Sequence, residues 1–172
     1  ARPVFTRFDL QQRDRFERLR RLEPLLTAGG DAIRGRSIFY GPKVACGSCH
    51  TIGNQGGHVG PDLTAVGAVR SAHDILEAIV FPSASFVPGH EIYRVETPTD
   101  VISGVLVSRA GDAVVLITGP NGEVRIPRSQ VRSLKPSPVS LMPEGLDEAL
   151  TPTEFADLLA FLRSQTSRET AL

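Results

Sequence analysis

The sequence has little cysteine and little methionine. Its 172 residues include two cysteines, one methionine and no tryptophan. Two cysteines cannot form the disulfide framework of a small secreted scaffold, and an iron–sulfur cluster requires about four thiolates. The two thiols, Cys46 and Cys49, stand three positions apart, so their chemistry belongs to one short turn of the chain.

The sequence has neither an excess of one sign of charge nor a long hydrophobic run. Lysine and arginine together number 19, as do aspartate and glutamate, so the balance does not favour a nucleic-acid partner. No apolar run approaches the roughly 20 residues of a membrane span, and we expect none. The hydrophobic fraction of 41% is sufficient for the core of one domain, with or without an insertion.

The most informative motif present is Cys46-Gly47-Ser48-Cys49-His50. Two thiols on a tight turn can each add to a vinyl group of one porphyrin, and the histidine that follows is carried beneath the ring. Gly47 and Ser48 are small, so the backbone can lie close to the macrocycle. The motif therefore predicts one covalently bound haem c, with His50 as an iron ligand.

Other uses of the two thiols are weaker interpretations. A structural zinc site would need about two more ligands at regular spacing, and only His58, His73 and His90 could be recruited. A redox dithiol normally follows a buried apolar strand and opens a helix. Residues 40–45 are instead turn-like, and such a dithiol would not require the adjacent histidine.

Helical patterns occupy both ends of the chain. Residues 9–27 carry apolar side chains at helical spacing among many charges. Asp31 is a good N-cap for a second helix, and Ser71 with Asp74 resembles a capping box for a third. A last helix should begin at Thr151, where proline and glutamate follow in favourable positions.

From about residue 91 the pattern changes to that of strands. Stretches rich in valine, isoleucine and threonine alternate with turn signals, and they predict five strands at 91–97, 101–108, 113–118, 123–127 and 131–134. We therefore predict an α+β chain with a helical domain at 30–88 and 136–166. An N-terminal helical extension covers 1–29, and an inserted small antiparallel β-sheet or barrel covers 89–135.

The helical elements resemble a class I cytochrome c. Gly35 and Phe39 resemble the glycine and aromatic residue of that family's first helix, where the glycine permits close crossing by the terminal helix. Leu158 and Phe161 resemble the aliphatic–aromatic pair of the crossing helix. The resemblance implies a cytochrome c helical haem domain into which the β subdomain is inserted.

Two loops extend this resemblance to the haem pocket. Residues 60–63 resemble the loop whose proline carbonyl accepts a hydrogen bond from the proximal histidine, which assigns that role to Pro61. Residues 141–143 resemble the loop that supplies the axial methionine, which assigns Met142 as the second iron ligand. Met142 is also the sole methionine of the chain, and His90 is the runner-up for this position.

A closer resemblance is to the haem-binding domain of large planctomycete-type proteins, on residues 81–86 and 140–146 with a β-rich insertion between them. In such proteins the domain often ends a longer chain, after a dehydrogenase-like or helical-repeat region. The resemblance implies a redox partner protein, or an upstream domain of a larger oxidoreductase. Haem attachment indicates a periplasmic or otherwise extracytoplasmic location.

The leading functional hypothesis is a monohaem electron carrier and not an enzyme, because histidine and methionine would fill both axial positions. The alternative is a five-coordinate or bis-histidine haem enzyme or gas or redox sensor, with His90 as its distal residue. In a third hypothesis the β insertion binds a partner protein or polysaccharide. Four further side chains could bond a haem propionate: Tyr40, Arg70, Tyr93 and Arg94.

Overall fold

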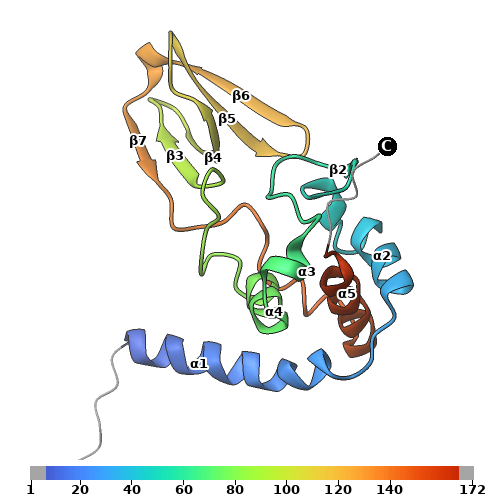
Figure 1. Ribbon diagram of the computed structural model, residues 1–172. Coiled ribbons are helices and arrows are strands. Elements are labelled where there is room, and N and C mark those ends of the chain that lie inside the picture. Colours follow the sequence, from blue (N-terminus) through green and yellow to red (C-terminus); the bar gives the residue numbers. More distant parts are fainter. Residues whose placement is uncertain (1–6, 167–172) are drawn as a thin grey trace, which may run out of the picture.

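The computed structural model describes residues 7–166, with side chains from residue 12 onward, and it confirms an α+β chain (Figure 1). The helices are α1 (Arg7–Leu22), α2 (Ala32–Tyr40), α3 (Val66–Val69), α4 (Ala72–Val80) and α5 (Pro152–Ser164). Short 3-10 turns lie at η1 (Glu23–Leu26), η2 (Cys46–Ser48) and η3 (Arg128–Gln130). None of the described helices is long and apolar enough to cross a membrane.

Side-chain caps begin three of these helices at the predicted residues. Asp31 accepts hydrogen bonds from two backbone amides in the first turn of α2. Ser71 with Asp74, and Thr151 with Glu154, form complete capping boxes at α4 and α5. Each cap satisfies backbone donors that the helix itself leaves without partners, so these boundaries are fixed locally.

Helices α2 and α5 cross closely, as the sequence predicts. A Cβ atom added to Gly35 would lie 2.0 Å from the Asp157 carbonyl oxygen, so only glycine permits this approach. Phe39 and Phe161 pack with ring centroids 5.5 Å apart. The buried carboxylate of Asp157 accepts hydrogen bonds from the Asp31 backbone amide and from the Arg34 guanidinium, which joins the two helices further.

Helix α1 lies along the helical body (Figure 1). Its Leu19 side chain is buried in the core shared with α2, α4 and α5. Arg15 forms an ion pair with Glu77 at 2.6 Å, and Arg18 does so with Asp147 at 2.8 Å. Both guanidinium groups also stack over the Phe81 ring, so α1 is attached to the body by apolar and charged contacts together.

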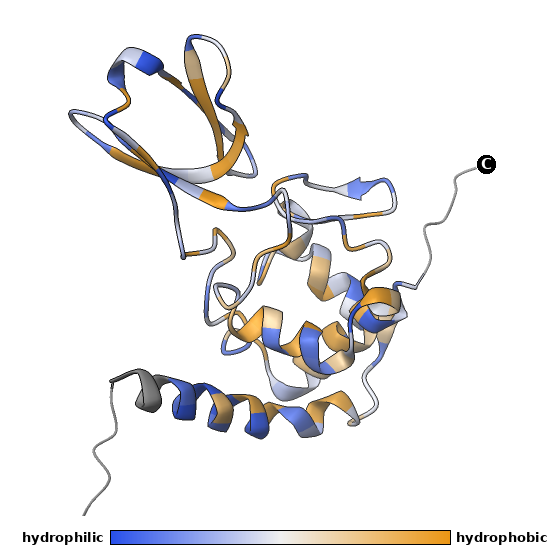
Figure 2. Cartoon of the chain, turned by 60° about the vertical axis from the view of Figure 1, so that its left-hand side comes forward, coloured by the Kyte–Doolittle hydropathy of each residue, from blue (hydrophilic) through white to orange (hydrophobic). Residues whose placement is uncertain are grey.

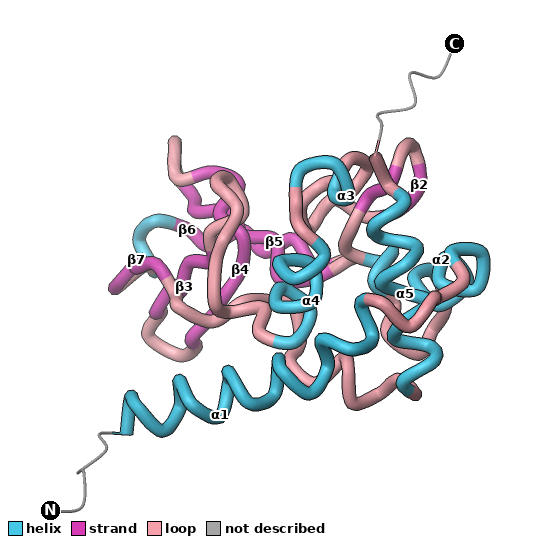
Figure 3. The backbone as a smooth tube through the Cα atoms, turned by 60° about the horizontal axis from the view of Figure 1, so that its bottom comes forward, coloured by secondary structure: helices cyan, strands magenta, loops and turns pink. Residues whose placement is uncertain are grey.

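The second part of the chain forms a five-stranded antiparallel sheet in the order β6-β5-β4-β3-β7, gathered to one side of the helices (Figure 3). Its strands are β3 (Ile92–Glu96), β4 (Val101–Ser108), β5 (Ala113–Gly119), β6 (Gly122–Pro127) and β7 (Ser133–Pro136). The first four overlap the predicted strands closely. The fifth begins two residues later than expected, because residues 128–130 form η3 and Val131 ends that turn.

Two separate clusters of buried side chains stabilise these two regions. The helical cluster includes Leu76, Phe155 and Leu158. The sheet cluster is smaller, with four fully enclosed members: Val95, Val114, Leu116 and Ile126. Figure 2 shows apolar residues concentrated along the strands and along the inward faces of the helices. Each region therefore has an apolar core of its own.

Candidate functional site

The cysteine–histidine motif folds as one tight turn. Its 3-10 segment, η2, is closed by a hydrogen bond from the His50 amide to the Cys46 carbonyl at 3.0 Å. Ala45, immediately before it, has φ of 47°, a left-handed conformation that is unfavourable for a residue with a Cβ atom. Both cysteines are partly buried and neither forms a disulfide. The turn thus presents two thiols and an imidazole from five consecutive residues.

A glycine-rich loop packs directly against this turn. A Cβ atom would lie 2.1 Å from the His50 carbonyl oxygen if added to Gly56, and 2.0 Å from the Ser48 carbonyl oxygen if added to Gly57. At Gly60 it would meet the His50 ring at 2.5 Å. The loop also contains a two-stranded ribbon, β1 (Thr51–Ile52) with β2 (Gln55–Gly56), which the sequence did not reveal. Its glycines are required by close backbone approach to the motif.

Pro61 fixes the orientation of the His50 ring. The Nδ1 atom of His50 lies 2.8 Å from the Pro61 carbonyl oxygen, and a carbonyl can only accept, so Nδ1 carries the proton. Burial lowers the pKa of His50; the hydrogen bond to Pro61 opposes this effect and the neighbouring His90 adds to it. The neutral ring therefore keeps a lone pair on Nε2, the state that a metal ligand requires.

All five residues predicted for the site line a single cavity of about 510 Å³: Cys46, Cys49, His50, Pro61 and Met142. Most of the remaining lining is apolar and comes from α4, α5, the loops around residues 59–66 and 140–146, and the edge of the sheet. Such a volume with few polar groups is typical of a site for a small molecule or cofactor.

Met142 reaches this cavity from a loop that is tied to the rest of the helical body. The Met142 amide donates to the Ser140 hydroxyl at 3.1 Å, and the Ser140 amide donates to the Ser83 hydroxyl at 3.1 Å. The Met142 side chain packs against the helical core cluster, and Pro143 restricts the backbone that follows. Backbone hydrogen bonds and side-chain packing therefore both restrain this loop at Met142.

The environment of the thiols does not suit redox or zinc chemistry. Burial raises the pKa of the Cys46 thiol to about 11, whereas reactive dithiols have a lowered pKa. Within residues 7–166, only His73, Asp74 and Glu77 bring three potential ligand atoms within 4.8 Å of one another. That trio lies on α4, away from both cysteines in the sequence. The His73 ring lies near Glu23, the Asp74 carboxylate accepts a hydrogen bond from the Ser71 amide, and the Glu77 carboxylate accepts one from Arg15.

The sheet contributes to the cavity, which the sequence did not reveal. Ile92, Val105 and residues 118–120 of the sheet and its β5–β6 turn lie in the wall. Of the four residues considered as propionate partners, Arg70 lines the cavity, whereas Tyr40, Tyr93 and Arg94 do not. No local pattern marks these wall residues, because they come from segments far apart in the sequence.

The other histidines fall in different environments. His58 is exposed, its Nδ1 atom lies 3.0 Å from the Thr51 hydroxyl, and it is absent from the cavity wall. His73 is on the surface, with its side chain 47% exposed and 3.5 Å from Glu23. His90 does line the cavity, so two candidates for a distal residue, His90 and Met142, share one wall.

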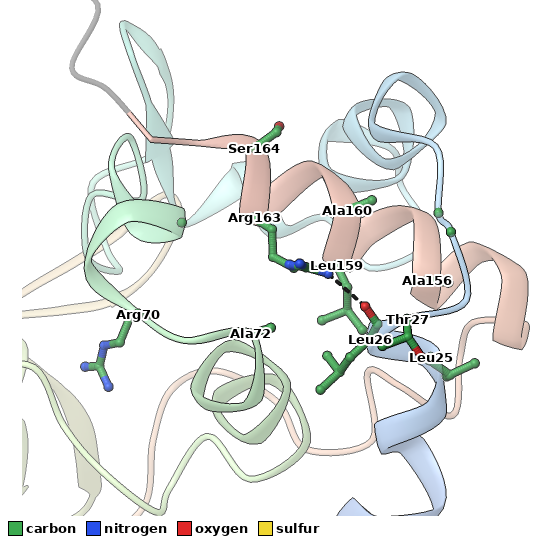
Figure 4. A pocket seen from close by; sticks show the side chains of 13 residues that line it. Leu25, Leu26, Thr27, Arg70, Ala72, Ala156, Leu159, Ala160, Arg163 and Ser164 are labelled. Atoms are coloured by element: carbon green, nitrogen blue, oxygen red, sulfur yellow. Dashed lines mark hydrogen bonds between the residues drawn. The ribbon is translucent and has the colours of Figure 1, made fainter.

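A second, larger depression lies on the other side of α5, with a volume of about 710 Å³. Arg163 reaches across it and donates a hydrogen bond to the Leu26 carbonyl at 2.7 Å (Figure 4). Its walls contain no cysteine, histidine or carboxylate side chain, but include several glycines and alanines of α5 and the neighbouring turns. This groove results from the packing of η1 against α5 and carries no group suited to catalysis.

Comparison with known proteins adds no identification to this geometry. The chain matches no protein-family model. A search of curated proteins likewise found no match. The functional argument therefore rests on the residues and their arrangement.

Proposed function

We propose that this chain is a monohaem c-type cytochrome domain that carries electrons, and that its helical part adopts a cytochrome c arrangement. The observation that carries the proposal is the shared cavity: both motif thiols, the His50 imidazole and the Met142 thioether line one largely apolar space. These donors fit a porphyrin covalently held along one edge. A bound haem would supply one-electron cycling of its iron between the ferrous and ferric states.

The residues of the chain would have distinct roles. Cys46 and Cys49 would each add sulfur and hydrogen across a vinyl group, a step that needs no oxidant. His50 would offer its Nε2 lone pair to the iron while the Pro61 carbonyl holds its Nδ1 proton. Met142 would supply thioether sulfur, a soft ligand that favours the ferrous state and raises the reduction potential.

The cavity wall would exclude water from the cofactor. Apolar side chains from α4, α5 and the sheet surround the motif, and this low-dielectric environment also influences the potential. If His50 and Met142 both held the iron, no substrate would bind the metal. The protein would then exchange electrons with a redox partner, or with an upstream domain of a larger oxidoreductase, in an extracytoplasmic compartment.

A second candidate function follows from His90, which lines the same cavity. If His90 ligated the iron, or if the distal position were open, the chain would be a bis-histidine or five-coordinate haem protein with an enzymatic or sensory role. The absorption spectrum distinguishes these possibilities, because methionine ligation of low-spin ferric haem produces a weak near-infrared charge-transfer band.

The decisive experiment uses protein made with a competent haem-attachment system. We expect the intact mass after acid–acetone extraction to retain one haem, and the ferric spectrum to be low-spin with the near-infrared band. Met142→Ala should abolish that band, lower the potential and permit rapid carbon monoxide binding by the ferrous form. Val139→Ala, an exposed position in the same loop, is the matched control and should change none of these.

Two results would contradict the proposal. An unmodified polypeptide mass would exclude covalent haem. A parent protein that is high-spin at neutral pH and binds carbon monoxide or cyanide rapidly would exclude the carrier and favour the second candidate function.

A further inference from the structure

Asp147 carries a buried carboxylate five residues after Met142. Its side chain is 5% exposed, and the Arg18 guanidinium of α1 donates to both carboxylate oxygens, at 2.8 Å and 2.9 Å. The same guanidinium lies 2.7 Å from the exposed carboxylate of Glu148. A charge removed from water is unfavourable unless it is paired and hydrogen-bonded. Arg18 therefore supplies the positive charge that allows Asp147 to stay buried.

This ion pair lies on the C-terminal side of the loop that carries Met142. Leu146, directly before Asp147, lines the same cavity as Met142 and packs against the helical core cluster. Among the described residues, only Arg18 forms hydrogen bonds or ion pairs with residues 143–150 from elsewhere in the chain. The charged contact with α1 is thus the polar anchor of this side of the loop.

A second arginine of α1 has similar surroundings but a different partner. The Arg15 and Arg18 side chains are 30% and 27% exposed, and their guanidinium groups lie 5.2 Å and 5.7 Å from the centroid of the Phe81 ring. Arg15 pairs with Glu77 of α4 at 2.6 Å. Both arginines therefore attach α1 to the helical body, but only Arg18 reaches the loop that carries Met142.

We propose that Arg18 is a positioning residue for Met142: through Asp147 it restrains the loop and keeps the thioether at the iron. This inference rests on the proposed function. The hydrogen bonds of Ser140 restrain the residues before Met142, and the Arg18–Asp147 pair restrains those after it. An axial sulfur can leave the iron only if its loop moves, so a loop anchored on both sides stabilises the ligated state.

Helix α1 would therefore act on the iron site from outside the cavity. None of its described side chains lines the cavity wall, so it cannot influence a bound haem by direct contact. Loss of the Arg18 charge would leave the Asp147 carboxylate buried without a partner, and the loop would relieve this by moving toward water. The population with Met142 away from the iron would then increase.

The test measures how rapidly cyanide binds the ferric holoprotein. Cyanide reaches the iron only after the sulfur has left, so its binding rate reports the population in which Met142 is dissociated. Arg18→Leu should raise this rate about tenfold, because it leaves a buried carboxylate unpaired. Arg15→Leu is the matched control and should bind cyanide at the rate of the parent. Arg18→Lys keeps the positive charge and should recover most of the difference.

Two further measurements separate the loop from overall stability. Amide hydrogen exchange across residues 140–150 should be faster in Arg18→Leu and unchanged in Arg15→Leu. Asp147→Asn should also accelerate cyanide binding. Adding Arg18→Leu to that variant should change the rate little further, because both substitutions remove the same interaction.

Contrary results would identify which step is wrong. Cyanide binding at the parental rate in Arg18→Leu would overturn the inference, as would equal acceleration in Arg15→Leu. Fully additive effects of Arg18→Leu and Asp147→Asn would exclude action through Asp147. Failure of the proposed function is a different result, visible in the parent as a missing haem mass or a missing near-infrared band. Hydrogen exchange across residues 140–150 would test the restraint by Arg18 in that case too.

Discussion

The helical body and the five-stranded sheet differ in what their cores contain. The helical body encloses polar groups with defined partners, including the Asp157 carboxylate and the Thr51 hydroxyl, and it carries the thiols, His50 and Met142. The buried cluster of the sheet consists of aliphatic side chains. The sheet contributes apolar side chains to the cavity wall, whereas the helical body contributes the two thiols, the imidazole and the thioether. The difference indicates that the sheet encloses a site that the helical body defines.

The largest loss of stability should come from shortening one buried leucine in either core. Leu76 in α4 and Leu116 in β5 are both fully buried, and replacing either by alanine should lower the free energy of unfolding by about 2–5 kcal/mol. Since the two clusters are separate, the effects should add to within about 0.5 kcal/mol in the double variant. Urea unfolding measures this, and a coupling well above that value would mean that the two cores act as one.

Close helix crossing should make the helical body intolerant of a single added carbon. Alanine at Gly35 would place Cβ 2.0 Å from the Asp157 carbonyl, and overpacking of this kind costs about 1–3 kcal/mol. Helix propensity alone would instead favour alanine by about 1 kcal/mol. The control is Gly119→Ala in β5, where nothing lies within 4 Å of the new Cβ atom. Thermal unfolding should show a loss at residue 35 and none at residue 119.

Acid should weaken the helical body through the carboxylates of α5. The Lys43 ammonium and the Thr151 amide lower the pKa of Glu154 from 4.5 to about 2, and the hydrogen bonds from Arg34 lower the pKa of Asp157. Because these pKa values are lower in the folded state, the stabilisation is complete above the unfolded-state pKa. It is lost as the pH falls through 4.5 toward about 2.

Unfolding free energies measured between pH 6 and pH 2 provide the check. Glu154→Gln should reduce the slope of the unfolding free energy against pH in that window. Above the window, the substitution should have less effect on the pH dependence. An unchanged slope would show that the Lys43–Glu154 pair, 2.7 Å apart, does not contribute to acid sensitivity.

The smallest effect concerns the strained residue before the motif. Glycine at Ala45 would relieve a left-handed conformation worth about 1–2 kcal/mol, and it would lose about 0.5–1 kcal/mol through backbone entropy. The net change should be between zero and about 1.5 kcal/mol of stabilisation. Ala113→Gly in β5, where φ is not positive, should instead destabilise. Equal destabilisation at both positions in urea titrations would contradict the strain at residue 45.

Several features could be predicted because they depend on short stretches of sequence. The caps at Asp31, Ser71 and Thr151 satisfy backbone donors within three residues, and the strands follow alternation and turn residues. The motif from Cys46 to His50 requires only one turn of chain. Other local features escaped prediction: α3 and the β1–β2 ribbon lie among glycines, which supply little periodicity.

The sequence by itself determined the capped starts of α2, α4 and α5 and the order of the five strands of the larger sheet, and its resemblance to a class I cytochrome c predicted the crossing at Gly35 and the side chains of the candidate site. Only the tertiary structure decided which of them share a cavity: it brings His90 and Arg70 into the wall with Met142 and leaves His58, Tyr40 and Tyr93 out. It also brings strand residues such as Val105 to the rim. Caps and periodicity act over a few residues, whereas this cavity wall is built from side chains as far apart in the sequence as Phe39 and Leu162. Its membership is fixed only when the two cores pack against each other.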